Sequence, residues 1–263
     1  MSGEALVEVR THGRACVVAL RREHKLNALS TALEGALAEA LDRAEVRASG
    51  CVVFTGGERA FSAGADVGEL RDRDPASILA YYRETGAVYE RVAALPQPTI
   101  SAIAGYCLGG GLELALATDL RIADRSAVFG LPEVSIGIVP SSGGMHRLVR
   151  LLGVARAKEI VLLGDRFGAD DAEGLGLVTE VVAEGHAEVR ALELAERMAG
   201  LPPMALALAK QAIDCMPEAS REAGLALERL AYGLLAQTEE AREAASAFTE
   251  KRPTGPPPRS AEA

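Results

Sequence analysis

Two glutamates, Glu113 and Glu133, have the surroundings in this sequence that point most directly to chemistry. Glu113 follows three glycines in "GYCLGGGLELALATD", residues 105–119, and its neighbours are leucine and alanine. Glu133 lies in a second glycine-bearing stretch, "FGLPEVSIGIVPSSGG", residues 129–144. Apolar surroundings raise the pKa of a carboxyl towards neutrality, where it can both give and take a proton. The pair predicts acid–base catalysis; the alternative is that each is an ordinary surface acid.

The run Gly109–Gly111 opens a segment that is typical of an apolar helix. The first N–H groups of a helix have no internal acceptor and lie at its positive dipole end, so they favour an anion or an oxyanion. Glycine leaves room for a ligand to approach that backbone. The alternative is close packing of the helix against a strand, and spacing alone leaves both open. The order G-G-G-x-E is not a dinucleotide fingerprint, and no Walker A motif is present.

Other reactive side chains form no recognisable site. His24, His146 and His186 lack the spacing of metal ligands, so no metal is expected. The four cysteines lie far apart and form no CxxC pair, which favours a reducing interior. Ser141 and Ser142 precede His146, but no G-x-S-x-G elbow surrounds them, so a turn is the better interpretation.

Composition excludes several classes of protein. The net charge of −9 argues against a general nucleic-acid or anionic-membrane binder. The sequence has no stretch of 18 apolar residues, so no membrane span is predicted. The N-terminus "MSGEALVEVRTHGR" lacks the basic-then-apolar pattern of a signal peptide. We therefore expect a cytoplasmic protein. The 263 residues suffice for a large domain with an appended lobe.

The elements that must position the glutamates alternate between strand and helix up to about residue 135. This order favours an α/β architecture. Predicted here are a hairpin over 5–21, a helix over 30–46 capped by Ser30, strands over 51–57 and 98–105, a helix over 74–95, and two short strands within 119–130. After residue 143 the chain reads as helices, with one strand over 177–182. We expect a core over 1–198, a helical C-terminal lobe over 199–252 and a disordered Pro-rich tail over 253–263.

Several segments together resemble the crotonase (enoyl-CoA hydratase/isomerase) superfamily, in order and over nearly the whole chain. They are "KLNALS" (25–30), "AFSAGADVGEL" (60–70), "AGYCLGGGLELALATDLRIA" (104–123), "FGLPEVSIGIVPSSGGMHRLVRLLG" (129–153), "AKEIVLLGDRFGADDAEGLGLVTEVV" (157–182) and "SAFTEKR" (246–252). The resemblance implies a ββα spiral body, a helical trimerisation lobe and a homo-oligomer, either a trimer or a hexamer made of two trimers. It implies an acyl-CoA substrate and no separate cofactor, since coenzyme A is part of the substrate.

The same resemblance implies roles for individual residues. Glu113 and Glu133 match the two catalytic glutamates of hydratases, which hold one water between them. The backbone N–H groups of Ala63 and Gly110 are expected to form the oxyanion hole. The substrate and its CoA moiety are expected to contact Lys25, Ala63, Gly64, Ala65, Asp66, Val67, Gly109, Gly110, Phe248 and Lys251, the last two from a neighbouring subunit.

Two positions bear on the reaction. Many hydratases of the family carry glycine where Ser141 stands, and dienoyl-CoA isomerases, aryl-CoA dehalogenases and hydroxyacyl-CoA hydrolases carry aspartate. Simple enoyl-CoA isomerases keep the acid at Glu133 and lack the one at Glu113. The resemblance therefore favours a hydro-lyase that adds water to a 2-enoyl-CoA and gives a 3-hydroxyacyl-CoA, as in the β-oxidation of fatty acids. The alternatives are an isomerase, another crotonase reaction in a specialised pathway and, less favoured, a non-catalytic or RNA-binding homologue.

Overall fold

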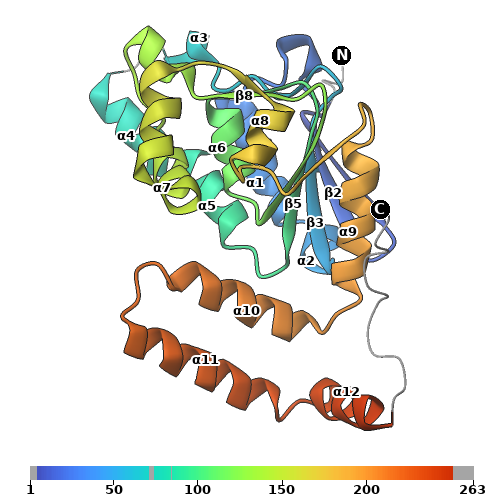
Figure 1. The fold of residues 1–263 in the computed structure, drawn as a ribbon. Helices are drawn as coiled ribbons and strands as arrows, with labels where there is room; N and C mark the ends of the chain where they lie inside the picture. The colour runs from blue at the N-terminus through green and yellow to red at the C-terminus, as the bar shows by residue number, and fades with distance from the viewer. Residues whose placement is uncertain (1–4, 71–73, 84, 251–263) are drawn as a thin grey trace.

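A computed structural model describes residues 5–70, 74–83 and 85–250 of the chain (Figure 1). The strands are β1 (Val7–His12), β2 (Ala15–Leu20), β3 (Cys51–Thr55), β4 (Ala60–Ser62), β5 (Thr99–Ile103), β6 (Tyr106–Leu108), β7 (Leu120–Asp124), β8 (Val128–Gly130), β9 (Phe167–Gly168) and β10 (Glu180–Val182). The α-helices are α1 (Thr31–Leu41), α2 (Ala44–Arg47), α3 (Val67–Leu70), α4 (Pro75–Arg83), α5 (Val88–Ala93), α6 (Gly110–Leu116), α7 (Gly144–Leu163), α8 (Ala169–Gly174), α9 (Ala187–Ala199), α10 (Pro203–Cys215), α11 (Arg221–Leu235) and α12 (Glu239–Thr249). Three short 3-10 helices are η1 (Glu23–Lys25), η2 (Thr85–Ala87) and η3 (Pro132–Ile136).

The strands form two sheets. The larger has the order β1-β2-β3-β5-β7-β10, and the smaller has the order β4-β6-β8-β9. In the larger sheet, β1 and β2 form the antiparallel hairpin predicted over 5–21, and every other neighbouring pair is parallel. Strands β2, β3 and β5 are buried along their whole length, as parallel strands are when helices cover both faces of a sheet.

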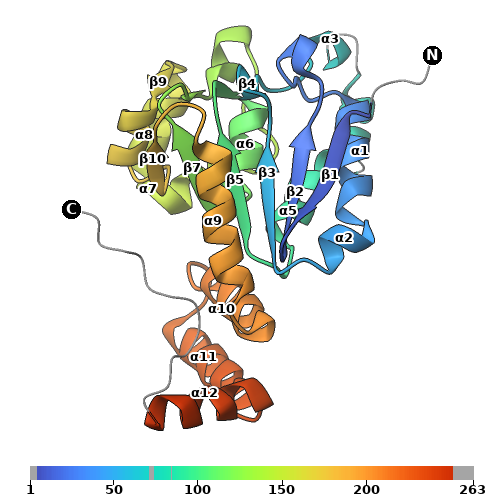
Figure 2. The ribbon, with the colours of Figure 1, turned by 90° about the vertical axis from the view of Figure 1, so that its right-hand side faces the viewer.

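Helices cover the two faces of the larger sheet (Figure 2). On one face α9 packs through Ala191, Leu194 and Ala195 against the odd-numbered residues of β2 and β3. On the other face α1, α5 and α6 pack against the even-numbered residues of the same strands, such as Val18 and Phe54. This alternation is the period of two expected for a strand. It confirms the α/β fold class, and the helical C-terminal part is confirmed by α10, α11 and α12.

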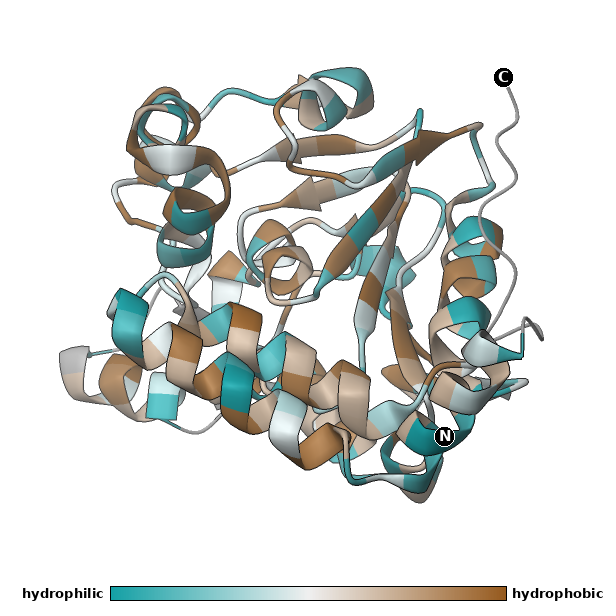
Figure 3. Cartoon of the chain, turned by 60° about the horizontal axis from the view of Figure 1, so that its bottom comes forward, coloured by the Kyte–Doolittle hydropathy of each residue, from teal (hydrophilic) through white to brown (hydrophobic). Residues whose placement is uncertain are grey.

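These three helices extend away from the sheets (Figure 1), with polar and apolar residues alternating along them (Figure 3). Lys210 on α10 joins them to the body, because its Nζ lies 2.9 Å from the Asp119 carboxylate. The domain limits at 198/199 and 252/253 stay predictions, and the tail over 253–263 lies outside the described residues. Within the described residues, no helix is long and apolar enough to cross a membrane.

Two predicted helices are broken in the structure. The segment 74–95 forms α4, η2 and α5 instead of one helix. Gly86 lies within the break, and glycine costs a helix about 1 kcal/mol relative to alanine. The segment 30–46 divides into α1 and α2 after Leu41. Its predicted cap is confirmed, since Ser30 Oγ accepts the Leu33 N–H.

Candidate active site

The glycine run joins β6 to α6 at the centre of the site. Gly109 has φ +51°, a conformation that favours glycine, and its N–H donates to the Gly130 carbonyl at 2.9 Å. A Cβ on Gly111 would overlap the Ser62 carbonyl, so close packing explains this glycine. Gly110 is the first residue of α6, and its N–H therefore has no acceptor within the helix.

The segment after β4 brings a second backbone donor to Gly110, and it is not the predicted one. The Ala63 N–H donates to the Leu26 carbonyl at 2.9 Å, so the prediction of an oxyanion donor at Ala63 is wrong. The Ala65 N–H makes no hydrogen bond within the described part of the chain. Its nitrogen lies 3.5 Å from the point where a Cβ on Gly110 would stand. Gly64, at φ +99°, makes this close approach possible.

Glu113 is buried, with 3% of its surface exposed, and its Oε1 has two backbone donors. The N–H groups of Ser142 and Gly144 donate to it at 2.8 and 2.9 Å. A Cβ on Gly144 would overlap Glu113 Cγ, so only glycine fits there. Burial raises the pKa of Glu113, while these N–H groups and the positive charge of Arg147 lower it. Burial is the largest of these causes, so the pKa of Glu113 lies above its ordinary value, and the hydrogen bonds to the carboxylate offset part of that rise.

Glu133, on η3, has the opposite surroundings. Its Oε2 is buried and has no hydrogen-bond partner among the described residues. Its Oε1 lies 3.0 Å from the point where a Cβ on Gly109 would stand. Burial, and then the negative charge of Glu113, raise its pKa to about 7. The two glutamates therefore lie close enough for their charges to interact, and near neutral pH Glu133 is about half protonated.

A hydroxyl and a carboxylate that the sequence did not indicate lie behind Gly110. The Tyr89 hydroxyl is 3.3 Å from the point where a Cβ on Gly110 would stand, and it donates to Glu34 at 2.9 Å. Tyr81 also donates to Glu34, which is only 1% exposed. Burial, together with the charge of Glu34, raises the pKa of Tyr89 well above its usual value. The available signal was the position of Glu34 beside Leu33 and three residues before Leu37, on the apolar face of its helix.

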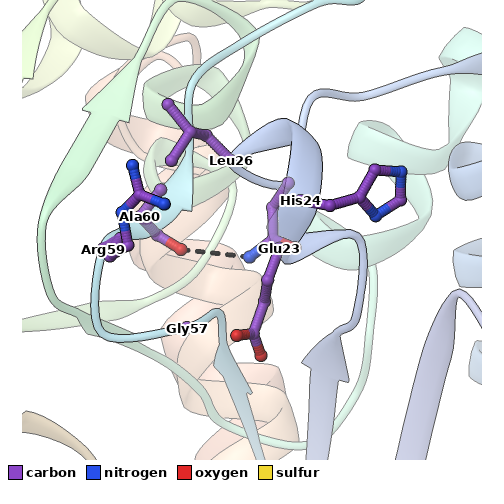
Figure 4. A pocket seen from close by; sticks show the side chains of 7 residues that line it. Glu23, His24, Leu26, Gly57, Arg59 and Ala60 are labelled. Carbon is purple, nitrogen blue, oxygen red and sulfur yellow. Dashed lines mark hydrogen bonds between the residues drawn. The ribbon is translucent and has the colours of Figure 1, made fainter.

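A separate cavity of about 220 Å³ lies between η1 and the turn that leads into β4 (Figure 4). Its lining consists of Glu23, His24, Leu26, Asn27, Gly57, Arg59 and Ala60. His24 and Arg59 give it basic groups, whereas Lys25 is exposed and is not part of the lining. Leu26, which lines this cavity, accepts the Ala63 N–H through its carbonyl and so links the cavity to the 63–65 segment.

The remaining predicted contact residues have these positions. Asp66 accepts a hydrogen bond from Arg22 at 2.7 Å, and Val67 begins α3 with half of its surface exposed. Phe248 belongs to α12, and Lys251 lies outside the described residues. Within the described ranges, no group of three or more His, Cys, Asp or Glu residues could hold a metal ion.

The fold and the site define a class of protein: an α/β body in which two glutamates meet beside the glycine-rich start of a helix. The chain belongs to the enoyl-CoA hydratase/isomerase family, which matches residues 10–255 and forms part of the crotonase superfamily. It is 41% identical over 240 residues to 2,3-dehydroadipyl-CoA hydratase of Escherichia coli, covering 91% of this chain and 93% of that protein.

Two further proteins are similar to this chain along nearly their whole length. The short-chain-enoyl-CoA hydratase of Clostridium acetobutylicum is 36% identical, over 94% of this chain and 95% of its own. The crystal structure of an enoyl-CoA hydratase from Bacillus anthracis superposes with a TM-score of 0.88 at 39% identity, over 94% of this chain and 97% of that one. These similarities support a crotonase-type enzyme.

Proposed function

We propose that this protein is a 2-enoyl-CoA hydratase, a hydro-lyase that adds water across the 2,3 double bond and gives a 3-hydroxyacyl-CoA. The observation that carries the proposal is the contrast between the two carboxyls. Glu113 has two backbone donors, which favour its anion. Glu133 has a pKa raised to about 7 and an oxygen without a partner in the described chain. Such a pair supplies a base and an acid at one place.

In the proposed step, Glu113 takes a proton from a water molecule as the water oxygen bonds to Cβ. Electrons of the double bond move towards the thioester, and Glu133 gives its proton to Cα. Negative charge that develops on the thioester oxygen is stabilised by the N–H groups of Gly110 and Ala65. One water is consumed, and the two carboxyls exchange protonation states. Solvent exchange after product release restores them.

The proposal includes the CoA moiety and its binding residues. Its phosphates need local positive charge in a protein of net charge −9. The cavity lined by His24 and Arg59, and also by Glu23, supplies basic groups, and Lys25 is exposed next to His24 in η1. We keep Phe248 and Lys251 as proposed contacts from a neighbouring subunit in a trimer or hexamer.

Isomerisation of a 3-enoyl-CoA is the second candidate. A single carboxyl with a pKa near neutrality can move a proton between two carbons, and Glu133 fits that description. Isomerisation does not need Glu113, so the two glutamates held together favour hydration. The names of the relatives, which specify short-chain and 2,3-dehydroadipyl thioesters, support a short or medium acyl chain.

A steady-state assay with 2-enoyl-CoA and 3-enoyl-CoA thioesters of short and medium length tests this function. We expect loss of the absorbance of the conjugated enoyl thioester as water adds to 2-enoyl-CoA. Turnover of 3-enoyl-CoA alone would establish the isomerase instead. Gly110→Val should cut hydration about 10²-fold, because its side chain crowds the proposed oxyanion donors. Gly35→Val, at an open position on α1, is the matched control.

A further inference from the structure

One arginine holds the turn that binds Glu113. Arg147, in the first turn of α7, donates from Nη1 to the Ser142 carbonyl at 3.0 Å. Its Nη2 donates to Glu90 on α5 at 2.7 Å. The N–H groups of Ser142 and Gly144 are the donors to Glu113. The Ser142 carbonyl belongs to the peptide group between residues 142 and 143. This group lies between the two peptide groups whose N–H groups bind Glu113, and Arg147 therefore fixes it in place.

The turn is shaped to admit this guanidinium. A Cβ on Gly143 would overlap Arg147 Nη1, and the φ of +88° at Gly143 also favours glycine. The Arg147 side chain is 15% exposed, while its partner Glu90 is 70% exposed. The arginine is therefore mostly enclosed, with one end on the catalytic turn and the other at the surface.

The charge of Arg147 acts on Glu113 as well. The ionisable groups that face Glu113 are Glu133 from η3, Tyr89 from α5 and Arg147 from α7. Arg147 is the cation among these three. Its positive charge lowers the pKa of Glu113, against the burial that raises it. Removal of this charge should therefore move the titration of Glu113 to higher pH.

We propose that Arg147 is a positioning residue for the reaction: it fixes the 142–144 turn so that Glu113 stays in place and ionised beside Glu133. The inference rests on the proposed hydration, in which Glu113 takes the proton from water. In this role Arg147 acts on Glu113 through its contacts with the Ser142 carbonyl and Glu90. Its effect should appear in kcat and in the pH profile more than in KM.

Three variants separate the parts of this role. Arg147→Met removes the charge and both hydrogen bonds; we expect kcat to fall about 10- to 100-fold, as for a misplaced catalytic group, with KM within about twofold of the parent. The acidic limb of kcat/KM should move to higher pH. Arg147→Lys keeps the charge and should restore the limb but only part of kcat. Glu90→Gln keeps the Ser142 contact and should have a smaller effect.

Arg150→Met is the matched control, because Arg150 lies three residues further along α7 and contacts the Asp214 carbonyl instead of the catalytic turn. It should behave as the parent in kcat, KM and pH profile. A folded Arg147→Met variant whose kcat and acidic limb of kcat/KM equal those of the parent would overturn the inference, even if its Tm were lower. If Arg147→Met does not fold, parental kinetics in both Arg147→Lys and Glu90→Gln overturn it. Absence of hydration by the parent protein would refute the proposed function itself, and the inference with it.

Discussion

At the residue scale, the site depends on two identical side chains with different surroundings. Glu113 has two backbone N–H donors and a nearby arginine. Glu133 has a buried oxygen without a partner in the described chain and a carboxylate beside it. Because hydrogen bonds favour the anion and burial disfavours it, these surroundings support the proposed roles of Glu113 as base and Glu133 as acid. In the proposed function, one residue type thus has two roles.

Removal of either carboxyl should disable hydration. Glu113→Gln and Glu133→Gln keep the shape of the side chain but cannot transfer a proton, so each should lower kcat by about 10²–10⁴. The double variant should lose far less than the product of the two effects, because the pair acts as a unit. Glu184→Gln, an exposed glutamate after β10, is the control. Intact hydration by Glu113→Gln would contradict the hydratase proposal and leave Glu113 a structural acid.

The activity should depend on pH through Glu133. If its protonated form gives the proton to Cα, kcat/KM for hydration should fall as the pH rises through about 7, the pKa of Glu133. A pH profile of kcat/KM measures this basic limb. A profile that stays level through that range would exclude Glu133 as the acid.

Stability should depend on pH through the same residue. The pKa of Glu133 is raised in the folded protein, so the unfolded chain binds fewer protons between the ordinary glutamate pKa of 4.5 and about 7. The free energy of unfolding should therefore fall as the pH rises across that interval. Glu133→Gln lacks this loss, so its Tm relative to the parent should be higher at about pH 8 than at about pH 5. Equal differences at both pH values would contradict burial as the cause.

At the element scale, the break between α4 and α5 gives the site its back wall. The break lets Tyr81 from α4 and Tyr89 from α5 both reach Glu34 on α1. Three helices therefore meet at one buried carboxylate, behind the first residue of α6. In a continuous helix over 74–95, these two tyrosines would lie about 12 Å apart along the axis, because they are eight residues apart and each residue rises about 1.5 Å.

Loss of the Glu34 carboxylate should be costly. Glu34→Leu would remove the acceptor of the buried Tyr89 hydroxyl, and an unsatisfied buried polar group costs about 1–3 kcal/mol of unfolding free energy. Glu39→Leu, at an exposed position on the same helix, should change it by about 0.5 kcal/mol or less. Urea unfolding compares the two. A similar small change in both variants would show that the tyrosines find other partners.

At the scale of the whole molecule, the helices α10, α11 and α12 bury little of their own surface. Large apolar side chains are exposed on them, including Ile213 at 68%, Leu230 at 71% and Tyr232 at 76%. Apolar residues gathered on one lobe mark a surface for association. This arrangement supports the proposed homo-oligomer, whose contacts would cover these residues.

A charge on this lobe should disrupt the assembly. Leu230→Glu would place a carboxylate in the proposed contact, and we expect a smaller species than the parent by light scattering. Leu230→Met keeps the apolar area and should assemble as the parent does. A parent protein that stays monomeric at all concentrations, with full hydratase activity, would refute the association.

The sequence alone predicted the strands of the larger sheet, the two glutamates and the glycine-rich start of α6, but not the short strands β4, β6 and β9 of the smaller sheet. These features are local: hydrophobic periodicity, a serine cap and glycine runs depend on residues close together in the chain. The helix over 74–95 was predicted wrongly because weak local preference cannot say where a helix bends to let two tyrosines share one acid.

The tertiary structure alone decided which backbone donors are free. Ala63 and Ala65 are both small residues in one loop, and nothing in "FSAGADV" distinguishes their N–H groups. The Leu26 carbonyl, which comes from a distant segment, accepts the Ala63 N–H and leaves the one at Ala65 beside Gly110. The unequal pKa values of Glu113 and Glu133 have the same origin. Solvation and hydrogen bonding depend on neighbours brought together only by the fold.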